Sequence, residues 1–371
     1  MEKQRTLIDL PFEVLDLILG ELKNLTDKLH LAQAHEYLGK AFAYHSRLEY
    51  KIFQPFSATF ELFVVIVKEC GSTIEELSNY YMNSPHWNDE LAKSIEKYCP
   101  NLKTVKLHVF GDNCEGVQIF LKNISKSLTS VELNIRPFVD PKKIFEAVAE
   151  MSNLKRLTCV NYTFDEVCQI QKLIALEELV IDSANPYHPP PINLLEICAP
   201  LINLRRLTAR FIAIMPSEMP HSMIWPEVES LSLNSCEIFT NFPDCPKLKT
   251  LDIAYTNSHV EGFLFGFILQ NGQNIEKINE KVKPPPFDGE SFLQVLRSCP
   301  KLQAFYTPMQ DIKIYQAYVS SLIATLKDIG VTSEEPFRLI IYSRGKFKWI
   351  HRLIPRTSHP ELIALDYLHR Y

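Results

Sequence analysis

The most reactive side chains in this sequence are nine cysteines and eleven histidines, and their spacing argues against catalysis. His108 and Cys114 lie close together, but a thiol and an imidazole need a third group that orients the base before they act as a nucleophile. The sequence contains no Gly-x-Ser-x-Gly, His-Glu-x-x-His, Gly-x-Gly-x-x-Gly or Gly-Lys-Ser/Thr motif. It therefore predicts no catalytic residue, no metal site and no cofactor.

Three cysteines recur in nearly identical segments, Cys99-Pro-Asn-Leu, Cys245-Pro-Lys-Leu and Cys299-Pro-Lys-Leu. A metal or redox site is one interpretation. The other is a small buried residue in a recurring turn, and free cysteine is among the most buried residue types. The wide separation of the three favours the turn, and the absence of any Cys-x-x-Cys pair and of a signal peptide favours reduced thiols.

Charged residues occupy alternate positions of short Leu-x-Leu segments, where side chains of a strand point away from the core. We expect five of them to form a lateral stripe of opposite charges that binds a protein: Arg156, Glu178, Asp182, Arg206 and Arg210. The alternative is an ordinary solvated surface. Mixed charge, with a net charge of −5 and a pI near 6.1, disfavours nucleic acid and anionic membranes as partners.

The segment 338–360 has six Lys and Arg residues and no Asp or Glu, with Phe347 and Trp349 among them. We predict that Arg344, Lys346 and Lys348 bind an acidic or phosphorylated segment of a protein, because arginine can bind an oxyanion through two hydrogen bonds. The alternative is a solvated edge of the last repeat with Trp349 packed beneath it.

These residues are positioned by an internal repeat. Apolar residues at the first, fourth and sixth places of a Leu-x-x-Leu-x-Leu frame begin at residues 74, 102, 128, 154, 176, 204, 228, 248, 275, 302 and 337. The starts are 20 to 35 residues apart, close to the period of leucine-rich repeats, roughly 20–29 residues. The pattern predicts an α/β fold, a leucine-rich-repeat solenoid with parallel strands on the concave face and helices or irregular legs outside.

Between the frames, apolar residues at helical spacing predict helices that return the chain. They occur near residues 91–98, 117–124, 144–148, 292–296 and 319–326, and Asp140-Pro141 predicts a helix start. The prolines of residues 212–226 and 241–246 predict extended or irregular legs instead. Residues 53–371 are thus expected to hold about ten or eleven irregular repeats and a C-terminal cap.

The first fifty residues do not follow this repeat. Phe12, Leu15, Ile18, Leu19 and Leu22 have helical spacing after Pro11. Asp27 is expected to cap a second helix, and a third is expected to run through Leu38, Phe42 and Leu48. Such a segment is too short for a globular domain and too apolar to lie exposed, so we expect another protein to complete its surface.

This segment resembles the F-box, whose pattern is met by Leu10-Pro11, Glu13, Leu15, Ile18-Leu19, Leu22 and Asp27 through Leu31. The resemblance covers residues 5–52, and the repeats cover most of the rest. It implies an F-box/leucine-rich-repeat protein whose F-box binds a Skp-type adaptor, and through it a cullin and a RING protein. It also implies adaptor-binding roles for the matching residues, which are Leu10, Pro11, Leu15, Ile18 and Leu22.

The resulting hypothesis is a non-catalytic substrate-recognition subunit of a Skp–cullin–F-box ubiquitin ligase, in the cytoplasm or nucleus. It would bind a protein substrate by its repeats and promote ubiquitination and proteasomal degradation by proximity. The alternative is a leucine-rich-repeat interaction scaffold outside any ligase, whose first helices only cap the repeats. The sequence does not name the substrate or any modification that its recognition needs.

Overall fold

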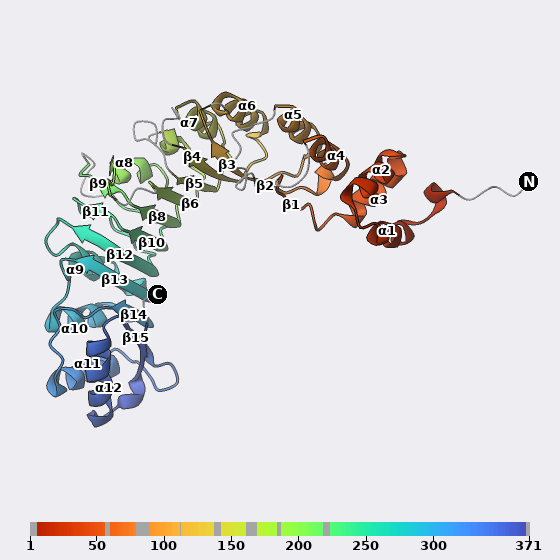
Figure 1. Ribbon diagram of the computed structural model, residues 1–371. Helices are drawn as coiled ribbons and strands as arrows, with labels where there is room; N and C mark the ends of the chain where they lie inside the picture. Colours follow the sequence, from red (N-terminus) through yellow and green to blue (C-terminus); the bar gives the residue numbers. More distant parts are fainter. Residues whose placement is uncertain are drawn as a thin grey trace, which may run out of the picture. The chain divides into compact units, whose positions relative to one another are not determined.

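The computed structural model describes residues 6–55, 60–78, 89–111, 113–136, 142–160, 169–183, 187–217 and 223–368. The chain divides into two compact units, residues 1–173 and residues 174–371. In both units short parallel strands alternate with helices or turns, which confirms the predicted α/β leucine-rich-repeat architecture (Figure 1). Within the described ranges, no helix has both the length and the apolar character needed to cross a membrane.

The first unit begins with a helical module. A 3-10 turn, η1 (Leu7–Asp9), precedes α1 (Phe12–Glu21), α2 (Leu25–Gln33) and α3 (Glu36–His45). Pro11 is the N-cap of α1, where its fixed φ of −67° and its missing N–H cost nothing. Leucine and phenylalanine side chains form the core of the module, among them Leu15, Leu19, Leu29 and Phe42.

Two predictions for this module are wrong in detail. Asn24, not Asp27, is the N-cap of α2, and Asp27 lies in the first turn, where its carboxylate accepts a hydrogen bond from the Asn24 amide at 3.2 Å. An acidic residue stabilises a first turn as well as a cap, so residue type alone did not distinguish the two positions. The third helix ends at His45, and Leu48 lies beyond it with 79% of its surface exposed.

The repeats of the first unit follow directly. The strands are β1 (Ile52–Phe53), β2 (Glu76–Ser78), β3 (Thr104–Val109), β4 (Ser130–Ile135) and β5 (Arg156–Val160), hydrogen-bonded in that order. The helices are α4 (Phe60–Cys70), α5 (Asp89–Tyr98), α6 (Cys114–Ile124) and α7 (Lys142–Ala149), with the 3-10 turn η2 (Gly71–Thr73) after α4. Helices α5 to α7 lie along one side of the strands (Figure 1). The predicted helix start at Asp140-Pro141 lies outside the described residues.

Helix α4 packs against α2 and α3, so the helical module and the first repeat share a core. Gly39 of α3 lies at this junction, where an added Cβ would come within 2.2 Å of a Glu69 carboxylate oxygen. The predicted domain boundary at residue 52 stays a prediction.

The second unit has eight strands in its main ladder, in the order β6 (Glu178–Asp182), β8 (Arg206–Arg210), β10 (Ser230–Asn234), β12 (Thr250–Ser258), β13 (Lys277–Lys283), β14 (Ala304–Thr307), β15 (Phe337–Ile341) and β16 (Ile363–Tyr367). Three shorter strands, β7 (Pro191–Ile192), β9 (Ala213–Ile214) and β11 (Glu237–Ile238), pair in a second ladder that joins the end of β12. The proline-rich leg after residue 212 thus contains an extended strand, as predicted.

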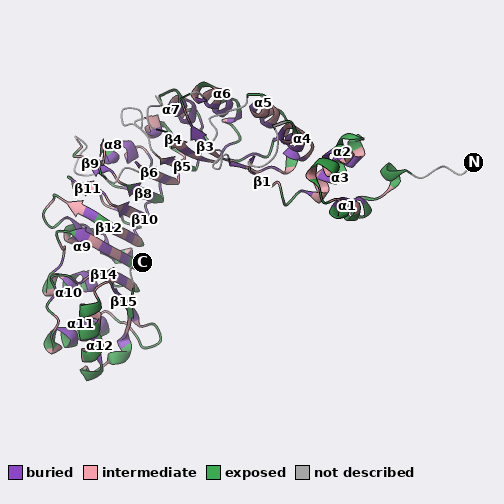
Figure 2. Ribbon diagram, in the orientation of Figure 1, coloured by how far each residue is buried: buried purple, intermediate pink, exposed green. Residues whose placement is uncertain are grey.

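The helices of this unit are α8 (Leu194–Cys198), α9 (Phe263–Asn271), α10 (Gly289–Ser298), α11 (Gln316–Asp328) and α12 (Arg344–Leu353). Its described residues also form the 3-10 turns η4 (Gly272–Asn274), η5 (Ile354–Arg356) and η6 (Pro360–Leu362). Buried residues lie along the strands and in parts of the helices (Figure 2).

The last frame was predicted one residue out of register. Its start was placed at Phe337, with Ile340 and Tyr342 following in the core. The ladder instead pairs Leu339 with Phe305 and Ile341 with Thr307, so Leu339 and Ile341 occupy the core places of the frame. A slip of one residue exchanges the two sides of a strand, and four consecutive apolar residues hid it. Strand β16 was not predicted.

Four repeats are bonded to the repeat before them by an asparagine in the turn that precedes their strand. The asparagine before the leading Leu or Ile donates its side-chain N–H to a backbone carbonyl of the preceding repeat. The bonds are Asn101 to Ser72 (2.7 Å), Asn153 to Lys126 (3.2 Å), Asn203 to Ile174 (2.9 Å) and Asn274 to Pro246 (2.9 Å). Cys99, Cys245 and Cys299 are buried in equivalent turns, as predicted.

Candidate functional site

The first candidate site is apolar and belongs to η1 and α1. Four aliphatic side chains there are exposed: Leu7 (44%), Ile8 (40%), Val14 (38%) and Leu17 (72%). We call these four residues the apolar surface. A large aliphatic side chain gains roughly 1.5–3 kcal/mol on full burial, so these residues suit a protein that covers them.

The five residues predicted to bind an adaptor lie at different depths. Pro11 is exposed, and Leu10, Ile18 and Leu22 are half-buried. Leu15 is only 1% exposed and belongs to the core of the module. Replacing Leu15 would therefore affect a partner indirectly, by loosening the module.

The residues of the apolar surface were missed, although α1 carries a signal for them. Apolar residues occupy both sides of this helix, Leu15 and Leu19 on the core side and Val14 and Leu17 on the other. A helix that is apolar all round is normally covered on both sides. The spacing of Val14 and Leu17, three residues apart, could have indicated the second side.

The turn that carries Leu10 and Pro11 is held by α3. The Tyr37 hydroxyl donates to the Leu10 carbonyl at 2.9 Å, and the Tyr37 and Phe12 rings lie 4.9 Å apart. On the same helices, His45 Nδ1 lies 2.6 Å from the Asp16 carboxylate. These contacts fix the start of α1 relative to α3, so the adjoining apolar surface is presented on a rigid support.

The second candidate site is the side of the second unit's strands opposite the helices, called here the strand face. Strand pairing defines two of its rows. The first row is Glu178, Arg206, Ser230, Thr250, Lys277, Ala304 and Arg338. The second is Val180, Thr208, Ser232, Asp252, Asn279, Tyr306, Ile340 and Asp366. A third, shorter row contains Asp182, Arg210, Asn234, Ala254 and Lys281.

Four of the five residues of the predicted charge stripe meet on this face. Arg206 Nη2 lies 2.9 Å from Glu178 Oε2, and Arg210 Nη1 lies 3.6 Å from Asp182 Oδ2. Arg156 is exposed at the start of β5, in the first unit. The stripe therefore consists of cross-strand ion pairs.

Strand order also brings together polar residues that the sequence did not single out. The Tyr342 hydroxyl donates to Asn279 Oδ1 at 2.7 Å, and Asn279 Nδ2 donates to Asp252 Oδ1 at 2.8 Å. Burial raises the pKa of Asp252, and the Asn279 hydrogen bond opposes that rise. Burial also raises the pKa of Tyr342 to about 12, so its hydroxyl keeps its proton and remains a donor.

The third candidate site is α12, which the basic segment forms. Arg344 and Lys348 are exposed, and neither side chain has an ion-pair or hydrogen-bond partner among the described residues. Lys346 differs, because its ammonium donates to the Ile312 carbonyl. Trp349 is 57% exposed, so the alternative interpretation is wrong in placing it beneath a solvated edge of the last repeat.

The expected absence of a catalytic residue or a metal site concerns the whole chain and stays a prediction beyond the described residues. Within them, no group of three or more His, Cys, Asp or Glu residues could hold a metal ion. Burial lowers the pKa of His108, with Arg136 adding to the effect, while burial raises the pKa of Cys99, Cys245 and Cys299 to about 12. Thiols with such pKa values are poor nucleophiles.

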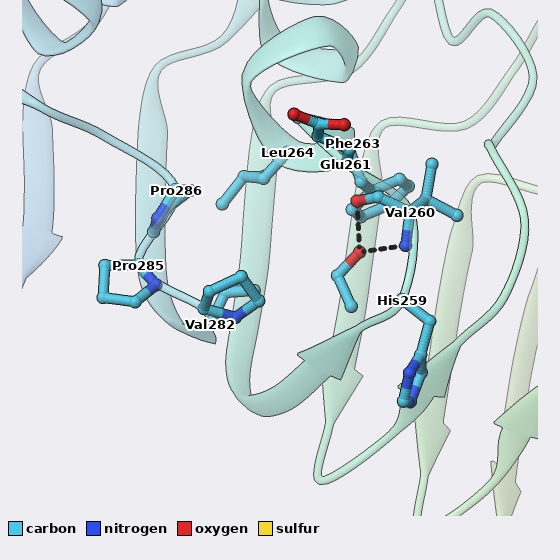
Figure 3. A pocket seen from close by; sticks show the side chains of 11 residues that line it. His259, Val260, Glu261, Phe263, Leu264, Val282, Pro285 and Pro286 are labelled. Atoms are coloured by element: carbon cyan, nitrogen blue, oxygen red, sulfur yellow. Dashed lines mark hydrogen bonds between the residues drawn. The ribbon is translucent and has the colours of Figure 1, made fainter.

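A hollow of 380 Å³ lies beside the ends of β12 and β13 (Figure 3). Its lining is largely apolar, with Val260, Phe263, Leu264 and the segment 284–286. The Ser258 hydroxyl in this lining is already bonded to the backbone N–H and carbonyl of Val260, at 3.3 and 3.1 Å. Two further polar side chains, His259 and Glu261, line the hollow, and His259 Nε2 lies 2.6 Å from the Glu237 carboxylate.

No family model and no curated protein matches the sequence. Among solved structures, the chain is similar to the yeast Rad7–Elc1 complex at 15% identity and a TM-score of 0.49, covering 97% of this chain and 93% of that one. It is also similar to the TLR13–ssRNA13 complex (16% identity, TM-score 0.47, 76% and 37% covered). A third is the mouse RP105/MD-1 complex (15%, 0.45, 85% and 60%). The strand pairing described above, not these likenesses, establishes the leucine-rich-repeat architecture.

Proposed function

We propose that this protein is the non-catalytic substrate-recognition subunit of a Skp–cullin–F-box ubiquitin ligase, acting in the cytoplasm or nucleus. The helical module binds a Skp-type adaptor and through it a cullin and a RING protein. The repeats bind a protein substrate, through the strand face and α12. The chemistry belongs to the partners, and this chain supplies proximity by raising the effective concentration of substrate lysines.

The observation that carries the proposal is the apolar surface. Leu7, Ile8, Val14 and Leu17 project from a turn and a helix that α3 holds in place. Solvated helices normally expose charged residues, so exposed leucines on a supported helix favour a protein partner. Their position next to Leu10-Pro11, where the F-box resemblance lies, favours a Skp-type adaptor as that partner.

The test is co-purification with a Skp-type adaptor. Ile8→Ser with Leu17→Ser should weaken adaptor binding more than tenfold, since burial of each side chain is worth roughly 1.5–3 kcal/mol and tenfold is about 1.4 kcal/mol. Ile119→Ser is the matched control, because Ile119 is 52% exposed on α6 and outside the apolar surface. Undiminished adaptor capture by the double variant would refute the proposal.

The packing of α4 on α2 and α3 favours a second candidate, a repeat-built interaction scaffold whose first helices are a cap. A cap needs α2 and α3 but has no use for exposed leucines on η1 and α1. Under this alternative the full-length protein would not capture the adaptor at all, and Ile8→Ser with Leu17→Ser would change no binding partner.

A further inference from the structure

The cations of the strand face fall into two groups. Each of three arginines has a carboxylate from a neighbouring strand within reach: Arg206 and Glu178 at 2.9 Å, Arg210 and Asp182 at 3.6 Å, and Arg338 and Asp366 at 3.5 Å. Lys277 and Lys281, both on β13, form no ion pair with any carboxylate of the described residues. The cations of this face without an ion pair among the described residues therefore lie on β13, and their charges act on the nearby Asp252 carboxylate, where they oppose the rise in its pKa.

Tyrosine rings hold both lysines in place. Lys277 Nζ lies 5.0 Å from the centroid of the Tyr306 ring. Lys281 Nζ lies 3.7 Å from the centroid of Tyr342 and 4.5 Å from that of Tyr255, and it donates a hydrogen bond to the Tyr255 hydroxyl at 2.9 Å. An ammonium above a ring is attracted by the π electrons, so these lysines lose less conformational freedom when they bind an anion.

The tyrosines are fixed in turn. Tyr342 is anchored by the chain of hydrogen bonds through Asn279 to Asp252. Tyr255 occupies a bulge of β12, where the pairing with β13 shifts between Ala254 and Thr256. Its φ is +55°, a left-handed conformation that is rare for a bulky side chain, and its ring is 54% exposed.

The left-handed conformation recurs at the equivalent position of neighbouring repeats. The residue after β8, Phe211, and the residue after β10, Ser235, have φ values of +53° and +54°. The repeat of β12 differs from those of β8 and β10 in the side chain at this position, because Tyr255 adds an aromatic ring and a hydroxyl beside Lys281. Strained residues persist where the surrounding structure holds them, often at binding sites.

Aromatic rings and lysines on a sheet also suit RNA, but two observations favour a protein. Bases stack on open ring faces, whereas the Lys281 ammonium lies over a face of Tyr342. The cations of the strand face without an ion pair among the described residues also lie on one strand, whereas a polynucleotide needs a positively charged groove that follows its backbone.

We propose that Lys277 and Lys281, positioned by Tyr306, Tyr255 and Tyr342, bind oxyanion side chains in an acidic segment of the protein partner. Lys277 and Lys281 point to one side of the same strand four residues apart, a separation of roughly 13 Å at about 3.3 Å per residue. An extended segment with acidic residues four positions apart matches this separation. The inference rests on the proposed function only in taking the partner to be a protein.

The test uses the full-length protein and a fluorescein-labelled ten-residue peptide with two glutamates four positions apart. Fluorescence anisotropy measures its affinity, and carbodiimide cross-linking with mass spectrometry locates the bound carboxylates. We expect binding that weakens with salt and cross-links at Lys277 and Lys281. A phosphoserine version, a version with glutamine for glutamate and a ten-nucleotide uridylate RNA complete the set of probes.

Lys277→Met with Lys281→Met should weaken peptide binding at least tenfold. The matched control is Lys247→Met with Lys249→Met, which removes the same charge from lysines paired with Glu227 and Glu229 and should change affinity less than twofold. Equal effects of the two double variants, cross-links confined to other lysines, or no binding by the glutamate and phosphoserine peptides would overturn the proposal. RNA binding stronger than peptide binding would overturn it in favour of nucleic acid.

A third variant separates positioning from stability. Tyr255→Gly removes the ring and relieves the left-handed backbone, so it should weaken binding several-fold without lowering the melting temperature. Ser235→Gly relieves the equivalent residue of the neighbouring repeat and should leave binding unchanged. Both lysine variants should still capture the adaptor. Failure of the unaltered protein to capture the adaptor would refute the proposed function but not the lysine site.

Discussion

The apolar surface and the strand face differ in how far their side chains already interact within the protein. On η1 and α1, aliphatic side chains are exposed to water, and contacts among them do not bury them. On the strand face most charges already have partners, since arginines of β8 bond to acids of β6. Exposed leucines are removed from water only when a partner covers them. Paired charges already interact with each other and gain less from a partner. The number of charged residues is therefore a poor guide to binding, and the few unpaired ones matter most.

The difference also has a signature in solution. Binding by the apolar surface depends on buried area, which salt hardly weakens. Binding by the strand face and α12 depends on charges, which salt screens over about 8 Å at physiological ionic strength.

The largest effect is expected within α1, where core and surface leucines alternate. Leu15→Ala should lower the free energy of unfolding of the module by about 2–5 kcal/mol, because Leu15 is buried. Leu17→Ala should change it little, because Leu17 is 72% exposed. Hydrogen exchange of residues 12–45 measures both, and equal protection in the two variants would contradict the assignment of the two sides.

The next effect concerns the core side of β13, opposite its lysines. Glu280 is 2% exposed and accepts a hydrogen bond from the Thr307 hydroxyl, and burial raises its pKa to about 8. The unfolded chain releases this proton near pH 4.5. Between the two values the native state binds more protons than the unfolded chain. The contribution of Glu280 to the free energy of unfolding is therefore greatest at low pH and falls as the pH rises.

Denaturant unfolding at several pH values tests this. Relative to Glu280→Gln, the unaltered protein should lose up to about 1.4 kcal/mol per pH unit between pH 5 and 8. If the free energies of unfolding of the two proteins changed in parallel with pH, Glu280 would be ionised in the native state.

A smaller effect is expected from the paired arginines. Arg206→Glu with Arg210→Glu places like charges against Glu178 and Asp182, which should reduce capture of protein partners about tenfold. Exposed ion pairs contribute only about 0–1 kcal/mol, so stability should change little. Quantitative mass spectrometry of captured proteins measures the loss. Reversal of Arg297 on α10 and Lys327 on α11 is the control, and an equal loss there would show that net charge alone matters.

The smallest effect separates two neighbouring cations of α12. Arg344 lies at the positive end of the helix dipole and has no partner among the described residues, so Arg344→Glu should raise the free energy of unfolding by about 0.3–1 kcal/mol. Lys346→Met should lower it by about 1 kcal/mol, because it removes the hydrogen bond to the Ile312 carbonyl. Shifts of the same sign in thermal melting would contradict this distinction.

Local patterns predicted the repeats well. Val105 and Leu107 pair with Val131 and Leu133 because the Leu-x-Leu alternation leaves one buried side per strand. The register of β15 was predicted wrongly because Leu339, Ile340 and Ile341 are all apolar, and alternation then carries no information. Strand β16 was missed although Leu362, Leu365 and Tyr367 occupy the first, fourth and sixth places of the frame.

The candidate sites were harder to predict, since they depend on contacts between distant residues. The sequence treated Arg344, Lys346 and Lys348 as equivalent, but only the fold brings Lys346 to the Ile312 carbonyl. Likewise, Tyr342 meets Asn279 across 63 positions of sequence. No spacing rule connects residues so far apart, whereas the order of parallel strands does.

The asparagines that precede four of the strands have a consequence for how such a chain evolves. Each of these side chains bonds to a carbonyl of the preceding repeat, as Asn153 does with Lys126 and Asn274 with Pro246. In each case the bond joins the side-chain N–H of the asparagine to a backbone carbonyl, so it does not depend on the side chain of its partner residue. Duplication or loss of one whole repeat within a unit therefore leaves the remaining asparagines with carbonyls to meet. A surface carried by these strands can widen or narrow by one strand in a single genetic event.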